Sequence, residues 1–412
     1  MLKLDSTLWK NLISLGINKY STLLFRYLGI LYLVWVIDVR GIGVISVFRT
    51  YTAYLIVAIN LGFLDYGIRE VARARENLSR TVAEITWSRL YILLLLIPFL
   101  VYFLVTLPGD GIERWMLFIF FLQIPVTILM FEWACIGLER MSILAKASFL
   151  GNTLNLLLLF LFVKGREGMV IVPAAQLAGI AVMAAYYYFA LADKLRWEGM
   201  IPVKTVMARL RNAVPITLTT FSVEILSSGE VLILSWFVSF EAIGSYRLAS
   251  TLYLLFASVK LLICQALYPR ISSFVAKGGT MSREILFKGA VLLGGTGVVI
   301  GAFMFFASGW VTRLAYMGKA DALTALLLGM LGIIIPLDFL NHFLYTYFLA
   351  YKREKSMAVI LATASGLLLL TGTVFVKNAG ILGIVPAKAV SGVFLLICYL
   401  FLSGIFKRDR VE

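Results

Sequence analysis

The chain has 412 residues, of which 61% are hydrophobic and 14% are charged, and its formal net charge at pH 7 is +15. This composition excludes a soluble globular domain, which is about half apolar and about one quarter charged. The three cysteines, Cys135, Cys264 and Cys398, lie inside apolar segments without the spacing of a disulfide framework or a metal site, so buried free thiols are expected. The sequence predicts an all-α polytopic membrane protein.

Apolar runs of about 20 residues, the length of a helix that crosses about 30 Å of hydrocarbon, recur twelve times along the chain. No run alternates like a barrel strand, so helices are expected to satisfy the backbone hydrogen bonds. The predicted transmembrane helices are 11–37, 42–64, 84–106, 112–137, 143–163, 169–191, 212–237, 242–268, 285–308, 321–350, 357–376 and 381–405.

The charges of the loops between these segments predict the orientation of the chain. With both termini in the cytoplasm, the cytoplasmic loops hold 21 Lys and Arg and the outer loops hold 7. Cytoplasmic loops accumulate basic residues, so we expect a multi-pass protein of the cell inner membrane with both termini cytoplasmic. The positive net charge then faces anionic lipid and does not indicate binding of nucleic acid.

The chain aligns with itself at an offset of 201 residues, where Trp35 meets Trp236 and Arg69 meets Arg270. Each half has a long helix, a short loop opening on Ile-Gly, a second long helix and a basic loop. Each half has six helices, an even number, so both halves start on the same side of the membrane. We therefore expect two like-oriented lobes, related by a pseudo-two-fold axis along the membrane normal, with a central cleft. The predicted parts are an N-terminal lobe 1–191, a cytoplasmic linker 192–211 and a C-terminal lobe 212–412.

Three basic residues fall inside the first two segments. Arg26 is near the middle of its segment, and Arg49 is about 10 Å deep in the second, with Lys19 as a further cation. Charges at this depth are costly unless they face water or a partner, and guanidinium groups hold phosphate through paired donors. These residues predict a site for a diphosphate; the alternative is internal neutralisation by Asp38 or Glu132, or snorkelling of Lys19.

Carboxylates fall inside the second half of the chain, with Glu224 and Glu230 on the seventh segment and Asp338 on the tenth, near Asn341. Carboxylate and amide oxygens of two facing helices predict coupling to an ion gradient, either by sodium at Asp338 or by a proton on a buried carboxylate. The alternative is a set of salt bridges. Their basic partners would be Arg247, Lys260 or Lys388.

Three stretches resemble a known family. Residues 41–54, GIGVISVFRTYTAY, and 61–76, LGFLDYGIREVARARE, resemble the start of polysaccharide-transporter flippases, and 266–274, ALYPRISSF, resembles the matching point of their second half. These are the O-antigen, or lipid-linked oligosaccharide, flippase branch of the multidrug/oligosaccharidyl-lipid/polysaccharide exporter superfamily. The twelve-segment layout extends the resemblance over the whole chain.

This resemblance implies flipping of an undecaprenyl-diphosphate-linked oligosaccharide from the cytoplasmic to the outer leaflet by alternating access. It implies that Arg26, Arg49 and Arg247 match the essential arginines of lipid II flippases. It also implies that Glu224 or Glu230 and Asp338 match the cation carboxylates of multidrug exporters. A monomer without a cofactor other than a coupling ion is expected, with a polysaccharide polymerase or glycosyltransferases as candidate partners.

Two other functions were weighed. A cation-coupled multidrug exporter of the same superfamily would need acidic groups where Arg26 and Arg49 stand, which argues against it. A membrane glycosyltransferase or polymerase would need a sizeable outer loop with catalytic acids, whereas the longest expected outer loop is 309–320. No Gly-rich phosphate loop or HExxH stretch occurs in the sequence. A secondary transporter is therefore predicted rather than an enzyme.

Overall fold

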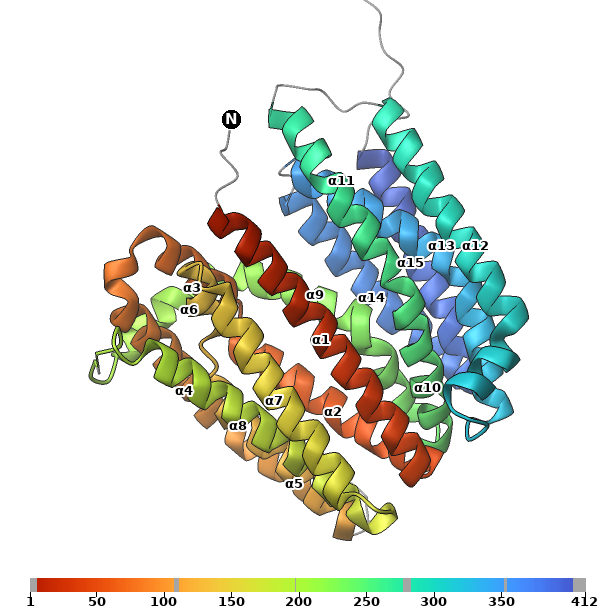
Figure 1. Cartoon of the computed structure of the whole chain (residues 1–412), viewed down its shortest axis with the longest axis horizontal. Coiled ribbons are helices and arrows are strands. Elements are labelled where there is room, and N and C mark those ends of the chain that lie inside the picture. The colour runs from red at the N-terminus through yellow and green to blue at the C-terminus, as the bar shows by residue number, and fades with distance from the viewer. Residues whose placement is uncertain (1–5, 107–110, 197, 277–282, 352–353, 403–412) are drawn as a thin grey trace, which may run out of the picture. The chain divides into compact units, whose positions relative to one another are not determined.

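The computed structural model describes residues 6–106, 111–196, 198–276, 283–351 and 354–402, and Figure 1 shows its helices. The chain forms two compact units, Met1–Phe221 and Ser222–Glu412. The first holds α1 (Ser6–Val36), α2 (Val39–Asn60), α3 (Phe63–Arg73), α4 (Leu78–Thr106), α5 (Gly111–Ile128), α6 (Glu132–Gly137), α7 (Met141–Phe162), α8 (Ile171–Leu191) and the start of α9 (Val203–Phe237). The second holds the rest of α9, α10 (Phe240–Ala257), α11 (Val259–Ala276), α12 (Arg283–Ala315), α13 (Ala322–Ala350), α14 (Glu354–Ala379) and α15 (Ile384–Leu402).

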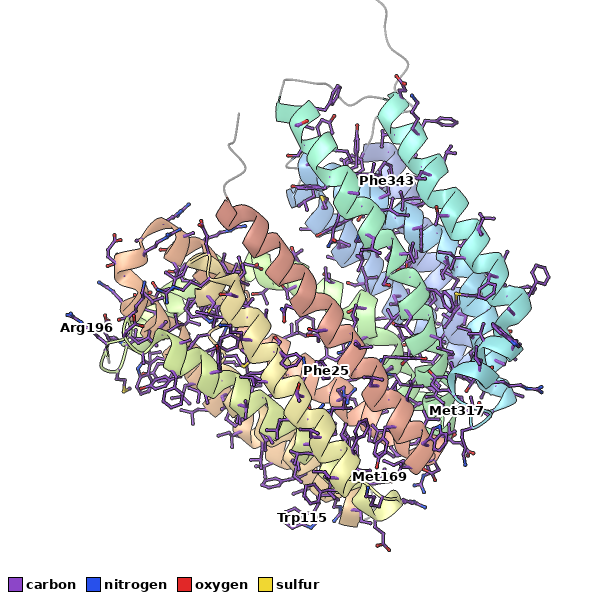
Figure 2. The ribbon with its side chains drawn as sticks, in the orientation of Figure 1. Phe25, Trp115, Met169, Arg196, Met317 and Phe343 are labelled. Carbon is purple, nitrogen blue, oxygen red and sulfur yellow. The ribbon has the colours of Figure 1, made fainter. Side chains whose placement is uncertain are left out.

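The all-α membrane architecture predicted from composition is confirmed. Among the described residues there is no strand, and ten helical stretches are long and apolar enough to cross a membrane. Large apolar side chains cover the outside of the units: in Figure 2 Trp115 and Met317 project outward, with 62% and 66% of their surface exposed, whereas Phe343 is buried among the helices. The count of twelve crossings stays a prediction.

The internal repeat recurs in the helix boundaries. α1 ends at Val36 and α9 at Phe237, and α2 begins at Val39 and α10 at Phe240, each 201 residues apart. The N-caps follow the same offset: the Asp38 side chain accepts a hydrogen bond from the Gly41 amide and the Ser239 side chain from the Ala242 amide. Both halves therefore use a short polar residue to satisfy the free amides at the start of their second long helix.

Two predicted segments are each divided into two helices. The segment 112–137 breaks after α5, where the amides of Leu129 and Met130 bond to carbonyls three residues back and tighten the last turn. The segment 242–268 breaks at Ser258, whose hydroxyl donates to the Leu255 carbonyl and competes with the helix backbone. α9 begins at Val203, inside the predicted linker 192–211.

In the first unit, α7 packs against α1 and α8, and α3 packs against α6. The contact between α3 and α6 needs two glycines: a Cβ at Gly67 would lie 2.3 Å from the Trp133 ring, and one at Gly137 would lie 2.8 Å from Cβ of Val71. Trp133 and Val71 are fully buried there in a cluster that includes Tyr187 of α8. The basic segment after α2 is thus fixed to the unit by apolar packing.

In the second unit, α13 is the central helix and packs against α10, α11, α12 and α15. α12 and α13 approach closely, because a Cβ at Gly301 would lie 2.4 Å from the Gly332 carbonyl oxygen. Pro336 lacks the amide that would bond to this carbonyl within α13. Small residues allow such close helix packing in membranes, where apolar area alone gives little driving force. α13 is also the helix that carries Asp338 and Asn341.

The close approach of α12 and α13 predicts a position-specific cost for a larger side chain. Gly301→Val is expected to lower the stability of the protein by about 1–3 kcal/mol, because the valine must displace the backbone of α13. Gly295→Val on the same helix meets open space and is expected to leave stability within about 0.5 kcal/mol of the wild type. Unfolding of both variants in detergent measures the difference, and equal stabilities would show that the two backbones do not meet at Gly301.

Candidate functional site

Arg26 lies on α1 with its side chain exposed, and no carboxylate among the described residues pairs with it. Phe25 beside it packs edge-on against Phe149 of α7, 5.7 Å between ring centres, which fixes this part of α1 to the unit. Lys19 is on the same helix, but its side chain lies outside the described residues. Among the described residues, Arg26 therefore presents a guanidinium that no carboxylate neutralises, on a largely apolar helix.

A polar seam that the sequence analysis did not single out runs between α1 and α7, near Arg26. The Asn152 amide donates to the Thr22 hydroxyl at 3.3 Å, and the amide oxygens of Asn18 and Asn155 are buried without a hydrogen bond to a described residue. Asn152 and Asn155 are three residues apart, so both lie on one face of α7. This spacing was the signal in the sequence that would have revealed the seam.

Arg49 is partly buried on α2 and takes part in a polar or charged interaction. Asp38, expected as one option for neutralising the arginines, instead caps α2 through a 2.8 Å hydrogen bond from the Gly41 amide. Thr50 and Thr52 follow Arg49 in α2 and are buried. The structure thus holds Arg26 and Arg49 on consecutive helices of one unit, at different exposures.

A second buried charge in the first unit had no role in the sequence analysis. Arg89 of α4 is 1% exposed, and its Nε and Nη2 donate no hydrogen bond to a described residue. Its charge interacts with that of Glu132, at the start of α6. Glu132, the other option expected for Arg26 or Arg49, therefore serves Arg89 and helps to hold α4 against α6.

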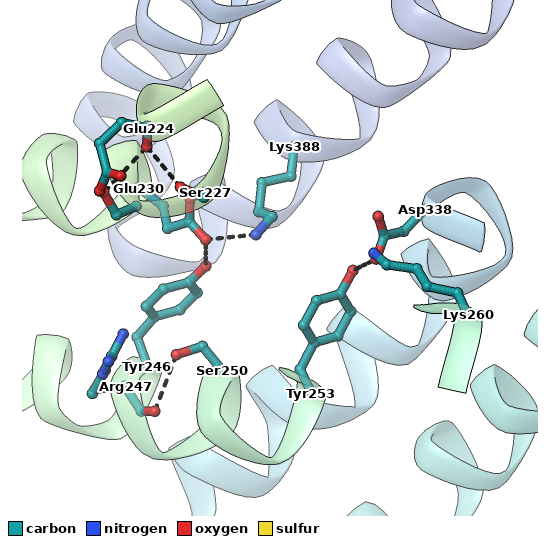
Figure 3. A network of polar contacts seen from close by, with 11 residues as sticks. Glu224, Ser227, Glu230, Tyr246, Arg247, Ser250, Tyr253, Lys260, Asp338 and Lys388 are labelled. Atoms are coloured by element: carbon teal, nitrogen blue, oxygen red, sulfur yellow. Dashed lines mark hydrogen bonds and ion pairs between the residues drawn. The ribbon is translucent and has the colours of Figure 1, made fainter. Parts of the chain in front are cut away.

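In the second unit the carboxylate of Glu230 is bound by two groups from other helices (Figure 3). Its Oε1 accepts from Lys388 Nζ of α15 at 2.5 Å and from the Tyr246 hydroxyl of α10 at 2.9 Å. Glu230 is 4% exposed, and its second oxygen, Oε2, accepts no hydrogen bond from a described residue. The charge of Glu230 is thus balanced by Lys388 through one oxygen, while the other oxygen has no partner among the described residues.

Asp338 of α13 repeats this arrangement. Its Oδ2 accepts from Lys260 Nζ of α11 and, at 2.9 Å, from the Tyr253 hydroxyl of α10. The two clusters are joined, because Lys388 Nζ lies 5.5 Å from the centre of the Tyr253 ring. We call these six residues the lysine–carboxylate network: Glu230, Lys388, Tyr246, Asp338, Lys260 and Tyr253. It links α9, α10, α11, α13 and α15.

The other predicted site residues of the second unit lie outside this network. Glu224 accepts a 2.6 Å hydrogen bond from the Ser228 hydroxyl one turn along α9. Asn341 donates to the Gly392 carbonyl of α15 at 2.9 Å, and its Oδ1 is buried without a hydrogen bond from a described residue. Arg247 is partly buried on α10 and has a polar or charged partner. Asp338 and Asn341, both predicted as ion-coupling residues, contact different groups in this structure.

The chemistry available at these sites is binding and charge neutralisation. In the part of the chain that the structure describes, no three His, Cys, Asp or Glu side chains are grouped to hold a metal ion. The first unit offers a guanidinium beside polar amides, which suits a phosphate oxygen. The second unit offers carboxylates whose charge is balanced by lysines. Such ion pairs can exchange partners when helices move.

Asp321, the N-cap of α13, ties this central helix to α10. Its carboxylate accepts from the Ser245 hydroxyl of α10 at 2.7 Å and from the amide and hydroxyl of Thr324. Partial burial opposes ionisation, but these hydrogen bonds outweigh it and hold the pKa of Asp321 below its ordinary value. The ionised cap therefore stabilises the fold above the ordinary pKa of an aspartate, and this contribution is lost as the pH falls through the lowered pKa.

Replacing this cap gives a pH-dependent prediction. Asp321→Ala is expected to lower stability by about 1 kcal/mol at pH 7 and by less as the pH falls below about 4, because the carboxyl of the unfolded chain protonates there and that of the folded protein at lower pH still. Ser239→Ala removes the neutral N-cap of α10, so its cost is expected to stay constant with pH. Thermal unfolding of the three proteins at several pH values measures this, and a parallel pH dependence for both variants would contradict the role of the Asp321 charge.

Comparison with known proteins relates this geometry to a family. Residues 8–275, about two thirds of the chain, match the family described as polysaccharide biosynthesis protein. The chain belongs to this polysaccharide biosynthesis protein family. The match covers α1 to α11 and so includes Arg26, Arg49 and Glu230. The resemblance seen in the sequence motifs is thereby confirmed.

Proteins similar to this chain carry the names of transporters and of a flippase. A protein of Escherichia coli (strain K12) named "Putative O-antigen transporter" is 22% identical over 376 residues, which are 88% of this chain and 89% of that protein. Lipid II flippase MurJ in an inward closed conformation has the same fold, with a TM-score of 0.70, 13% identity, and coverage of 94% of this chain and 86% of MurJ. An inward-facing multidrug resistance MATE transporter of the MOP superfamily matches with a TM-score of 0.67 and 14% identity over 97% of this chain and 100% of that one.

Proposed function

We propose that this protein is a flippase that moves a lipid-linked oligosaccharide, with an undecaprenyl diphosphate carrier, from the cytoplasmic to the outer leaflet. Two observations carry the proposal. The chain belongs to the polysaccharide biosynthesis protein family, and Arg26 is an exposed arginine without an ion pair to a described residue. The relative named as an O-antigen transporter supports the choice of substrate class. The transporter folds of MurJ and MATE support movement of a substrate rather than catalysis.

In this proposal the arginines of the first unit bind the diphosphate. Arg26 is exposed and free of ion pairs to described residues, and Arg49 lies on the next helix. A guanidinium donates two parallel hydrogen bonds to phosphate oxygens, which is stronger than a contact between neutral groups. Arg247 and Lys19 are proposed to contact the same substrate in other stages of transport.

The remaining parts of the proposal concern topology. Both termini face the cytoplasm, because the basic residues of the loops favour that side about threefold. The lobes 1–191 and 212–412, joined by the linker 192–211, alternate between inward-open and outward-open states of a monomer in the inner membrane. The polysaccharide polymerase or the glycosyltransferases that make and use the substrate are proposed as partners.

Coupling to an ion gradient is proposed to act through the second-unit carboxylates, namely Glu224, Glu230 and Asp338, with Asn341 as a neighbouring ligand. Lysine ammonium groups already bind the oxygens that a sodium ion at Glu230 or Asp338 would need. We therefore propose proton transfer, rather than sodium binding, as the form that such coupling takes. An Asp338→Asn variant whose transport depends on the proton gradient as strongly as that of the wild type would contradict the role of Asp338.

The experiment that tests the substrate class compares binding of three ligands to the purified protein in detergent. A short-chain polyprenyl diphosphate is expected to bind at least about tenfold more tightly than the matching polyprenol, because only the diphosphate pairs with the arginines. The organic cation tetraphenylphosphonium is expected not to compete. Competition by the cation, without binding of the diphosphate, would replace the flippase with a multidrug exporter.

A further inference from the structure

The lysine–carboxylate network balances its own charge. It holds two carboxylates, Glu230 and Asp338, and two ammonium groups, Lys388 and Lys260, each pair in direct contact. All four groups lie within helices long and apolar enough to cross a membrane. Buried charges are tolerated when paired and hydrogen-bonded, and the hydroxyls of Tyr246 and Tyr253 supply those further bonds.

Each ammonium group contacts its carboxylate from another helix. Lys388 reaches from α15 to Glu230 on α9, and Lys260 reaches from α11 to Asp338 on α13. Lys388 also sits against the face of the Tyr253 ring, an arrangement that attracts any monovalent cation. A carboxylate oxygen of Glu230 and the face of the Tyr253 ring therefore surround a positive charge, as in a cation-binding site. Here that charge is the ammonium group of Lys388.

Removal of Lys388 would leave the buried Glu230 carboxylate without a balancing charge. Oε2 of Glu230 is buried without a hydrogen bond from a described residue, so the carboxylate depends on Lys388 for its balancing charge. Without Lys388, an uncompensated carboxylate would remain in a site 4% exposed, with both oxygens available to a cation. Sodium takes oxygen ligands of this kind and carries the same charge as the ammonium group.

We propose that Lys388 and Lys260 are tethered cations that neutralise Glu230 and Asp338 in place of a mobile cation, and that Lys388 sets the cation specificity of the Glu230 site. The wild-type protein then binds no sodium there, and loss of Lys388 creates a sodium site. This inference goes beyond the proposed function, because it concerns cation binding in the absence of any lipid substrate.

The experiment uses the full-length purified protein in detergent, in sodium chloride or choline chloride at equal ionic strength. The wild-type melting temperature is expected to be the same in both salts. Lys388→Met is expected to melt at a lower temperature in choline and to regain about 3 °C or more as sodium is added, with saturation. The double variant Lys388→Met/Glu230→Gln is expected to lose both the destabilisation and the sodium response.

A matched control is the exposed pair of Lys288 and Glu284 on α12, where Lys288→Met is expected to change neither stability nor sodium response. Binding of radioactive sodium to the wild type adds a test that needs no variant, and none is expected. Saturable sodium binding by the wild type, or a Lys388→Met protein that ignores sodium, would overturn the proposal. Sodium binding by the wild type would also contradict proton coupling, whereas the lipid substrate is tested with lipid ligands, so the flippase proposal fails separately.

Discussion

Arg89→Met is expected to lower the free energy of unfolding by about 3–5 kcal/mol, one of the two largest effects that the structure predicts. Arg89 is 1% exposed within α4, and its charge interacts with Glu132. Methionine fills a similar volume but leaves the Glu132 carboxylate in a buried place without a balancing charge. Breaking a buried ion pair on one side is costly for this reason, whereas removing both charges costs far less.

The double variant Arg89→Met/Glu132→Gln is therefore expected to recover at least about 2 kcal/mol of this loss. The control is Arg75→Met, because Arg75 pairs with Glu139 at 3.2 Å where both side chains are more than half exposed. Its expected cost is below about 1 kcal/mol. Unfolding in detergent compares the four proteins; a double variant as unstable as Arg89→Met alone would show that Arg89 acts through its packing and not through Glu132.

Arg26→Ala/Arg49→Ala is expected to reduce transport of a lipid diphosphate by about 100-fold or more while the protein still inserts and folds. A hydrogen bond to a charged group contributes about 1.5–3 kcal/mol, and each 1.4 kcal/mol is a factor of ten. Arg26 forms no salt bridge with a described residue, whereas Arg49 takes part in an interaction that its replacement removes. Transport is therefore compared at equal amounts of folded protein.

Two controls separate charge from geometry. Arg26→Lys/Arg49→Lys keeps the charges but removes the paired donors, so an intermediate loss of transport is expected. Arg313→Ala removes an exposed arginine near the end of α12 in the second unit and is expected to leave transport unchanged. Unchanged transport in the double alanine variant, measured at equal amounts of folded protein, would remove the arginines from the mechanism.

Much of the fold was predictable, because the constraints are local. A run of apolar residues long enough to cross a membrane must be helical, and the short polar residues Asp38 and Ser239 mark where α2 and α10 begin. The offset of 201 residues predicted the matching layout of the two halves, but not that Asp38 and Ser239 are equivalent caps. The breaks at Leu129 and Ser258 were missed, since a tightened helix end changes hydrogen bonds without changing hydrophobicity.

The pairing of the membrane charges was predictable only in part. Lys260 and Lys388 were predicted as candidate partners of the second-half carboxylates, but Lys388 and Glu230 are 158 residues apart and no local pattern joins them. Glu132 was one alternative for neutralising Arg26 or Arg49, whereas it interacts with Arg89. Predicting which of several cations pairs with a given carboxylate requires knowing how the helices pack. That packing depends on contacts such as the one between Gly67 and Trp133.

Flipping itself is measured with a labelled lipid-linked oligosaccharide in proteoliposomes. A membrane-impermeant reagent that destroys exposed sugars reports how fast the protected fraction reaches the outer surface. The account predicts that wild-type protein speeds this exchange above the rate in protein-free vesicles and that Arg26→Ala/Arg49→Ala returns it to that rate. Exchange by folded wild-type protein no faster than in protein-free vesicles would contradict the account.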